Sequence, residues 1–220
     1  MIKHYLTLCL INLLFLASVT AQEKKEFEGL IKYSHKVIAR DSTFDVNYDY
    51  SGIGNHSDFY YKNGNYKWLT FDSYFVMDLF LTKEKKNYLQ TDNPDTVLCL
   101  NSTIPDGEVL DQSIKKAVDT INGHSCDVLI IKLKPMHKDG PISYRRYYYS
   151  GDFYVDPSHF AGCKGNCYDL IYGQIKSIAL RIEFEWPNRT IIWEATKIEP
   201  MKLDDSFFRL GKKYVINQIN

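Results

Sequence analysis

The sequence has no excess of charge of either sign. Its 220 residues include 27 Lys and Arg against 27 Asp and Glu. Proteins that bind nucleic acid or anionic membrane surfaces usually concentrate basic residues on one face. The balanced composition therefore predicts no nucleic acid partner.

Long hydrophobic runs are missing, with one exception near the start of the chain. Residues 5–16 form an apolar stretch that is shorter than the roughly 20 residues of a membrane-spanning helix. The compact residues Val19 and Ala21 stand at positions −3 and −1 of a cleavage site before Gln22. This pattern predicts a cleavable signal peptide over residues 1–21, with a retained membrane anchor as the alternative.

Signal cleavage would place the protein in the periplasm or outside the cell, without a transmembrane anchor. The remaining chain has the length of one domain. We expect a short polar N-terminal segment over residues 22–26, a single domain over 27–210 and a C-terminal tail over 211–220.

Motifs for catalysis are also missing. The chain has no G-x-S-x-G elbow, no P-loop and no H-E-x-x-H helix, which removes the commonest hydrolase, nucleotide-binding and zinc-protease signatures. His159, Cys163 and Cys167 recur at intervals of four and could suit zinc or copper. Gly162 and Gly165 argue against the helix that would align them, a fourth ligand is not evident, and a disulfide is the favoured alternative. Outside the predicted signal peptide, the remaining histidines lack metal-site spacing: His35, His56, His124 and His137.

Glu183 and Glu185 are the other candidate for chemistry, because two carboxylates on one strand face could flank a sugar. Arg181 shares that face, so an ion ladder exposed to solvent is the favoured interpretation. We expect no enzyme activity, no cofactor and no metal.

Cysteine is scarce, and four residues remain after the predicted cleavage: Cys99, Cys126, Cys163 and Cys167. An even number in an exported chain suggests two disulfides, for which three connectivities exist. We favour Cys99–Cys126, which joins two apolar strand-like runs, and Cys163–Cys167, which encloses a Gly and an Asn that permit a tight turn. The first bridge would stabilise the fold by about 3 kcal/mol. Free buried thiols are the alternative.

Strand and turn patterns dominate the rest of the chain. Apolar and polar side chains alternate over residues 178–186, Pro187 interrupts them, and an apolar stretch returns over 190–198. Period-two alternation places one face of a strand in the core. Residues 178–198 therefore predict a β-hairpin.

Similar pairs surround Asn63–Gly64 and Asp92–Asp95, and Asn122–Gly123 precedes an apolar stretch over residues 126–133. Asn-Gly supplies the positive φ angles of tight hairpins. Helix candidates are a turn or two within Asp106–Val118, and Tyr168–Ile175, although Gly173 weakens the latter. The chain is therefore predicted to be mainly β.

Some strands are apolar on both faces, as at residues 128–131 and 147–149. A sheet with one face in water would not tolerate this pattern. We expect the second face to be covered by a helix or a second sheet, or to line an apolar cavity for a ligand.

Three stretches together resemble the outer-membrane lipoprotein carrier (LolA-like) superfamily, in particular its Bacteroidetes-type exported members. They are Phe27–Tyr33, Lys115–Cys126 and Ala195–Phe208. The resemblance implies a single curved antiparallel sheet that forms a half-barrel, with short helices over a concave face able to hold an acyl chain. It also favours a strand over Ile114–Val118.

Two features depart from that superfamily. The carrier proper uses an arginine in its cavity, which cannot be mapped onto one residue here; Arg145, Arg146 and Arg181 are candidates. The predicted disulfides are an addition. From the resemblance we therefore take the fold and the general class of ligand, and no specific residue.

The sequence predicts an exported, non-enzymatic protein that binds a hydrophobic or lipid-like ligand in the cavity of a curved β-sheet. The alternative is a structural or protein-interaction module of the cell envelope with a filled core. An exported hydrolase is the third hypothesis. A cavity lined by apolar groups distinguishes the first from the second.

Overall fold

A computed structural model of the chain describes residues 24–93, 95–136, 140–211 and 215–219. The predicted signal peptide over residues 1–21 lies outside the described residues. So do Gln22 and Glu23, the first residues of the predicted polar segment.

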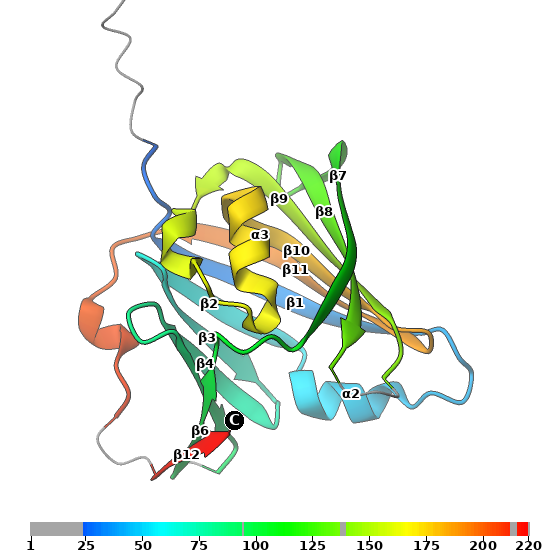
Figure 1. Ribbon diagram of the computed structural model, residues 1–220, viewed down its shortest axis with the longest axis horizontal. Helices are drawn as coiled ribbons and strands as arrows, with labels where there is room; N and C mark the ends of the chain where they lie inside the picture. Colours follow the sequence, from blue (N-terminus) through cyan, green and yellow to red (C-terminus); the bar gives the residue numbers. More distant parts are fainter. Residues whose placement is uncertain (1–23, 94, 137–139, 212–214, 220) are drawn as a thin grey trace, which may run out of the picture.

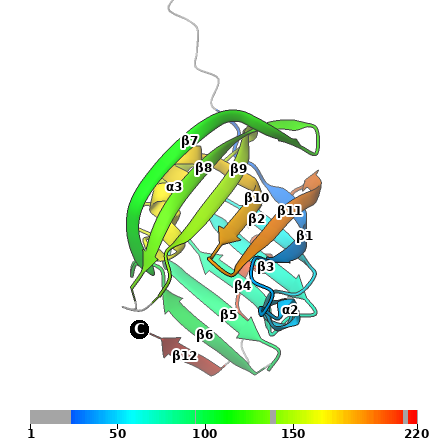
Figure 2. The ribbon, with the colours of Figure 1, turned by 90° about the vertical axis from the view of Figure 1, so that its right-hand side faces the viewer.

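Twelve strands form one sheet in the spatial order β12-β6-β5-β4-β3-β2-β1-β11-β10-β9-β8-β7. The strands are β1 (Gly29–Ala39), β2 (His56–Lys62), β3 (Asn65–Phe71), β4 (Phe75–Leu81), β5 (Lys86–Thr91), β6 (Thr96–Asn101), β7 (Gly107–Ile121), β8 (His124–Pro135), β9 (Ser143–Tyr154), β10 (Ser177–Glu185), β11 (Arg189–Pro200) and β12 (Val215–Ile219). All neighbours pair antiparallel except β12, which pairs parallel with β6. The sheet curls without closing (Figures 1 and 2). The predicted mainly β half-barrel is confirmed.

The predicted hairpins are present. β10 and β11 pair from Arg181 with Glu194 to Glu185 with Thr190. Between β2 and β3, Asn63 and Gly64 adopt φ angles of 47° and 77°. A Cβ on Gly64 would lie 2.5 Å from the His159 side chain, so this turn requires glycine for its conformation and for its close packing.

The described helices are short. They are α2 (Val46–Ile53), α3 (Tyr168–Ile175) and the 3₁₀ turns η1 (Pro157–Phe160), η2 (Gly165–Cys167) and η3 (Asp205–Phe208). α3 has the bounds that the sequence predicts. α2 was not predicted, and the Asp45 side chain caps it by accepting a hydrogen bond from the Asn47 amide at 2.9 Å. The alternative helix within Asp106–Val118 is wrong, because these residues pair with β8 as β7.

Both faces of the sheet are covered in part. α3 lies over the concave face (Figure 1), where two clusters of buried residues meet it. On the convex face, Phe208 of η3 packs with Leu79, Tyr88 and Val97 of β4, β5 and β6. A second layer therefore buries much of the apolar surface that the sequence leaves on both faces.

The sheet also extends beyond the predicted domain. β12 lies within residues 211–220, the predicted C-terminal tail, and continues the sheet from β6. Among the residues described, no helix combines the length and the apolar character needed to cross a membrane.

Candidate ligand-binding site

The concave face of the half-barrel contains a cavity of about 300 Å³ beneath α3. Its wall is mainly aromatic and aliphatic. The strands contribute Tyr33, Phe59, Tyr66, Trp68, Thr70, Phe75, Met77, Asp78, Leu89, Arg145, Tyr147, Ile178, Ala179, Ile182, Phe184 and Trp193, and the helices and their flanks contribute Gly52, Ile53, Asn166, Tyr168, Ile171, Tyr172 and Ile175. This volume lies at the lower end of the range of about 300–1,000 Å³ typical of ligand sites.

The register of the sheet places one row of side chains across the cavity floor. Phe59 lies opposite Trp68, Trp68 opposite Asp78, and Asp78 opposite Leu89. Residues directly opposite each other share a face of the sheet and have Cβ atoms about 5 Å apart. Asp78 is therefore a carboxylate between an indole ring and an aliphatic side chain.

A second row of side chains, on β9, β10 and β11, also faces the cavity. Tyr147 lies opposite Ile182, and Ile182 lies opposite Trp193. Trp193 then meets Trp68 of the first row, with ring centroids 4.9 Å apart. The two rows thus meet at the Trp68–Trp193 pair.

Trp68 is the centre of the aromatic packing. Its ring stacks on Tyr33 at 5.2 Å and meets the edge of Phe59 at 4.8 Å between centroids. Tyr33 is fixed in turn because its hydroxyl donates to the Ala179 carbonyl at 2.6 Å. Mutual packing of this kind holds the rings in defined orientations.

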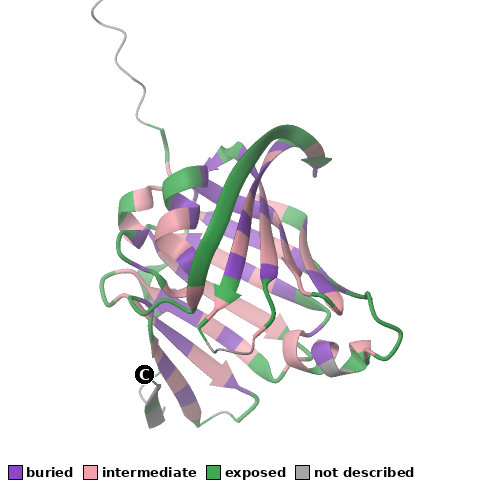
Figure 3. Cartoon of the chain, turned by 45° about the vertical axis from the view of Figure 1, so that its right-hand side comes forward, coloured by how far each residue is buried: buried purple, intermediate pink, exposed green. Residues whose placement is uncertain are grey.

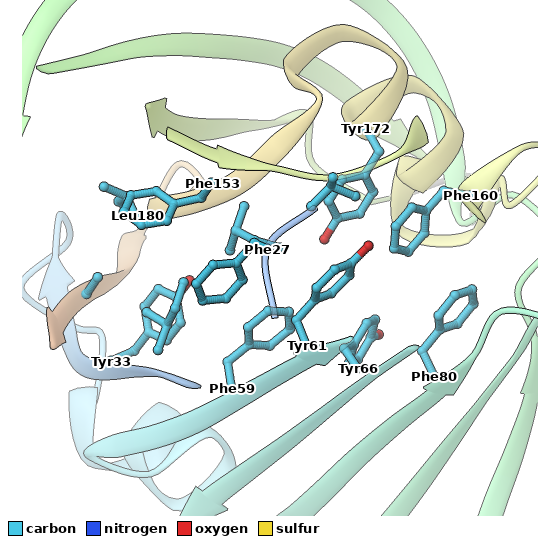
Figure 4. Packing of buried hydrophobic residues seen from close by; sticks show 14 of the residues in the cluster. Phe27, Tyr33, Phe59, Tyr61, Tyr66, Phe80, Phe153, Phe160, Tyr172 and Leu180 are labelled. Carbon is cyan, nitrogen blue, oxygen red and sulfur yellow. The ribbon is translucent and has the colours of Figure 1, made fainter. Parts of the chain in front are cut away.

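The roof of the cavity is α3, and η1 packs against it. Tyr172 of α3 stacks on Phe160 of η1 at 3.8 Å, and Phe160 stacks on Phe80 of β4 at 5.4 Å. Figure 4 shows Phe80 and Tyr66 rising from the sheet toward Phe160 and Tyr172. Stacked rings therefore connect the roof to the floor.

One end of the cavity is polar. The Asp78 carboxylate accepts hydrogen bonds from the Tyr66 hydroxyl at 3.1 Å and from the Asn87 amide at 2.8 Å. The Tyr66 hydroxyl lies 2.6 Å from that of Tyr168. Ser102 donates to the Asn87 carbonyl oxygen at 2.5 Å. The polar groups around the carboxylate are therefore all neutral.

Burial raises the pKa of Asp78 to about 6, although the hydrogen bonds from Asn87 and Tyr66 oppose the rise. Burial and the nearby Asp78 charge raise the pKa values of Tyr66 and Tyr168, so both phenols stay neutral. In the described part of the chain, no Lys, Arg or His forms an ion pair with Asp78. The described side chains that hydrogen-bond to Asp78 are thus both neutral.

Arg145 is the cationic group of the cavity wall and lies opposite Phe184 on β10. Its guanidinium donates to the Asp106 carboxylate at 2.8 Å. Burial alone would lower the pKa of Arg145, but Tyr147 in its ionised form and the Asp106 carboxylate raise it above its ordinary value. Among the three arginine candidates, Arg145 is therefore the one that lines the cavity.

The other two arginines pair with carboxylates in the adjacent rows of the sheet. Arg146 contacts both Glu183 and Glu185, and Arg181 contacts Glu194 and, at 2.6 Å, Asp119. The two glutamates therefore belong to an ion ladder, but their partner is Arg146 and not Arg181, and their side chains are only 16% and 15% exposed rather than open to solvent.

One indole in the wall lacks a hydrogen-bond acceptor. The Trp193 Nε1 atom is buried and has no partner among the described protein atoms. A buried donor without an acceptor costs about 1–3 kcal/mol.

The predicted disulfides are not present. Cys99, Cys126, Cys163 and Cys167 are all free and buried in the structure. β6, which carries Cys99, is second from one edge of the sheet, and β8, which carries Cys126, is second from the other. Each thiol also packs in a different apolar cluster from its predicted partner: Cys163 lies with Cys126 in the first cluster, Cys167 in the second and Cys99 in the third.

His159 does not join the two cysteines in a metal site. Its Nε2 atom lies 3.2 Å from the Glu26 carboxylate, and across the described ranges no three His, Cys, Asp or Glu residues gather as metal ligands. The other described histidines have their own partners: His35 with the Ile53 carbonyl and Ser57, His56 with the Phe71 ring, and His124 with Asp152. His137 lies outside the described residues.

Apart from Arg145, which was one of three candidates, sequence reasoning did not identify the charged residues of the cavity wall. Asp78 is the only charged residue in the apolar run Phe75–Leu81, and a charge within a buried strand is a signal of function. The sequence does not show which face of the sheet Asp78 occupies, because the β-bulge between Phe75 and Met77 shifts the alternation of side chains. No protein-family model matches the chain, and no curated protein matches it.

Proposed function

We propose that this chain is an exported, non-enzymatic protein that binds a hydrophobic or lipid-like ligand in the cavity of its half-barrel. The observation that carries the proposal is the aromatic cavity of about 300 Å³ between the concave sheet and α3. A filled core, as a purely structural module would have, is packed to the density of an organic crystal.

The composition of the wall favours an amphipathic ligand. Trp68, Phe59 and Ile182 offer apolar surface, whereas Asp78 and Arg145 offer charge at separate places on the wall. Burial of apolar ligand surface contributes roughly 25 cal/mol per Å². A few polar groups would then set the orientation of the ligand.

Native mass spectrometry of the protein purified from the envelope fraction and medium of an exporting host tests the proposal. We expect a bound mass that solvent extraction removes, and saturable binding of a fluorescent fatty acid to the extracted protein. A protein that carries no ligand and does not bind the probe would refute ligand binding.

Two leucines provide a matched pair of variants. Leu89 lines the cavity, and Leu98 lies directly opposite it on β6, on the same face of the sheet but outside the cavity wall. Leu89→Trp would fill the cavity and should abolish probe binding, whereas Leu98→Trp should leave it intact. Equal loss in both variants would point to damage to the sheet instead.

A second candidate function is that of a protein-interaction module. β7 forms one edge of the sheet and is exposed along nearly its whole length (Figure 3). Four large apolar side chains on it are exposed: Val109, Leu110, Ile114 and Val118. An edge of this kind offers unpaired backbone groups to another strand. A ligand-free protein whose sedimentation depends on concentration, and no longer does so in Leu110→Lys, would favour this function.

A further inference from the structure

We propose that the cavity recognises an organic cation, an amine or quaternary ammonium group on an apolar body, whose charge binds at Asp78 against the aromatic wall. This inference rests on the proposed ligand binding and adds the chemistry of the ligand's polar group.

The first support is the unbalanced charge of Asp78. Asp78 is half-buried at the cavity surface, and a carboxylate partly removed from water is costly unless a cation compensates it. The two hydrogen bonds to Asp78 come from the neutral groups of Tyr66 and Asn87. With a pKa of about 6, this carboxyl is largely ionised at pH 7. A bound cation would supply the missing positive charge.

The second support is the set of rings around the carboxylate. Trp68 lies directly opposite Asp78 in the β3–β4 ladder. Tyr66 contacts the carboxylate itself, and Tyr168 of α3 contacts Tyr66 from above. Cations bind to the faces of such rings, most strongly to tryptophan. A carboxylate bordered by electron-rich rings is thus a site for an ammonium group.

Arg145, the positive charge on the cavity wall, does not neutralise Asp78 in place of a bound cation. Arg145 lies on β9, far from β4 in the strand order, and Asp106 already neutralises it at 2.8 Å. An anionic ligand would have to share Arg145 with that carboxylate. The net unpaired charge of the cavity is therefore negative.

Isothermal titration calorimetry with three ligands of equal chain length tests the inference: octyltrimethylammonium, octanol and octanoate. The unmodified protein should bind the ammonium compound at least about tenfold more tightly than octanol, with octanoate weakest. This comparison needs no variant, so it stands even if a substitution disturbs folding.

Asp78→Asn then assigns the preference to one residue. Asparagine has nearly the same shape but no charge, so the preference for the ammonium compound should fall by about tenfold while octanol binding stays. Asp58→Asn is the matched control, because Asp58 is an aspartate of β2 that interacts with Lys32 and Tyr60 and does not line the cavity. It should keep the preference.

The outcomes separate the two proposals. Similar affinities for all three compounds, or an ammonium preference that persists in Asp78→Asn, would overturn the cation site and leave apolar ligand binding intact. Tighter binding of octanoate that is lost in Arg145→Gln would overturn it as well. No binding of any of the three would count against ligand binding itself.

Discussion

The hydroxyl oxygens of Tyr66 and Tyr168 lie 2.6 Å apart and join β3 on the floor of the cavity to α3 on its roof. Both phenols are kept neutral by burial and by the nearby Asp78 charge. The contact therefore serves two purposes at once: it positions the helix, and it extends the polar network around Asp78 to the other side of the cavity.

Tyr168→Phe should weaken the attachment of α3. The variant removes one partner of a partly buried hydrogen bond while it keeps the ring, so the free energy of unfolding should fall by about 1 kcal/mol. Urea denaturation followed by tryptophan fluorescence measures the change. Tyr60→Phe is the control, because the Tyr60 hydroxyl makes only a long contact of 3.5 Å to Asp58; a loss of equal size there would contradict the assignment.

Asp78 should make the protein less stable as the pH rises. Its pKa is about 6 in the folded state against an ordinary value of 3.8, so the folded state binds more protons than the unfolded state between these values. Its contribution to stability is present below pH 3.8 and is lost as the pH rises through 6, by about 3 kcal/mol.

Asp78→Asn removes this effect. Relative to the unmodified protein, the variant should gain about 3 kcal/mol in unfolding free energy between pH 3.5 and pH 7. Urea titrations at a series of pH values measure the difference. A difference that does not change with pH would show that Asp78 titrates normally.

The period of the side-chain pattern was sufficient to predict much of the fold. The alternation over residues 178–186 and the Asn63–Gly64 turn both predict local pairing, and both hairpins form. Local pairing needs only neighbouring sequence, so it can be read from the chain. α2 was missed because its residues Val46–Ile53 include Gly52 and lack a clear apolar stripe.

The site depends on contacts between distant segments, and these could not be read in the same way. Cys99 and Cys126 both lie in apolar runs, but only the order of the strands shows that they are near opposite edges of the sheet. Asp78 meets Tyr168 through Tyr66 because α3 returns over the sheet some 90 residues later along the chain. Period and spacing do not contain that information.

Two glycines should respond in opposite ways to alanine. Gly173 lies inside α3, and a Cβ there would meet no atom within 4 Å. Gly173→Ala should therefore stabilise the protein by about 1 kcal/mol, through higher helix propensity and a less flexible unfolded chain. Gly64→Ala should destabilise it, because φ is +77° and the new Cβ would clash with His159. Thermal melts of both variants measure the changes; a lower melting temperature for Gly173→Ala would show that the helix needs its glycine.

The thiols should be countable and slow to react. The four cysteines that would remain after the predicted cleavage before Gln22 are all free and buried. Burial raises the pKa values of Cys126 and Cys163, and it raises that of Cys167 to about 11. Because the thiolate is the reactive form, we expect almost no reaction with a thiol reagent in the native state and four thiols per chain in denaturant. Protein taken from its native compartment should give the same count without reduction. If no thiol reacts in denaturant, the two disulfides that the sequence predicts are present after all.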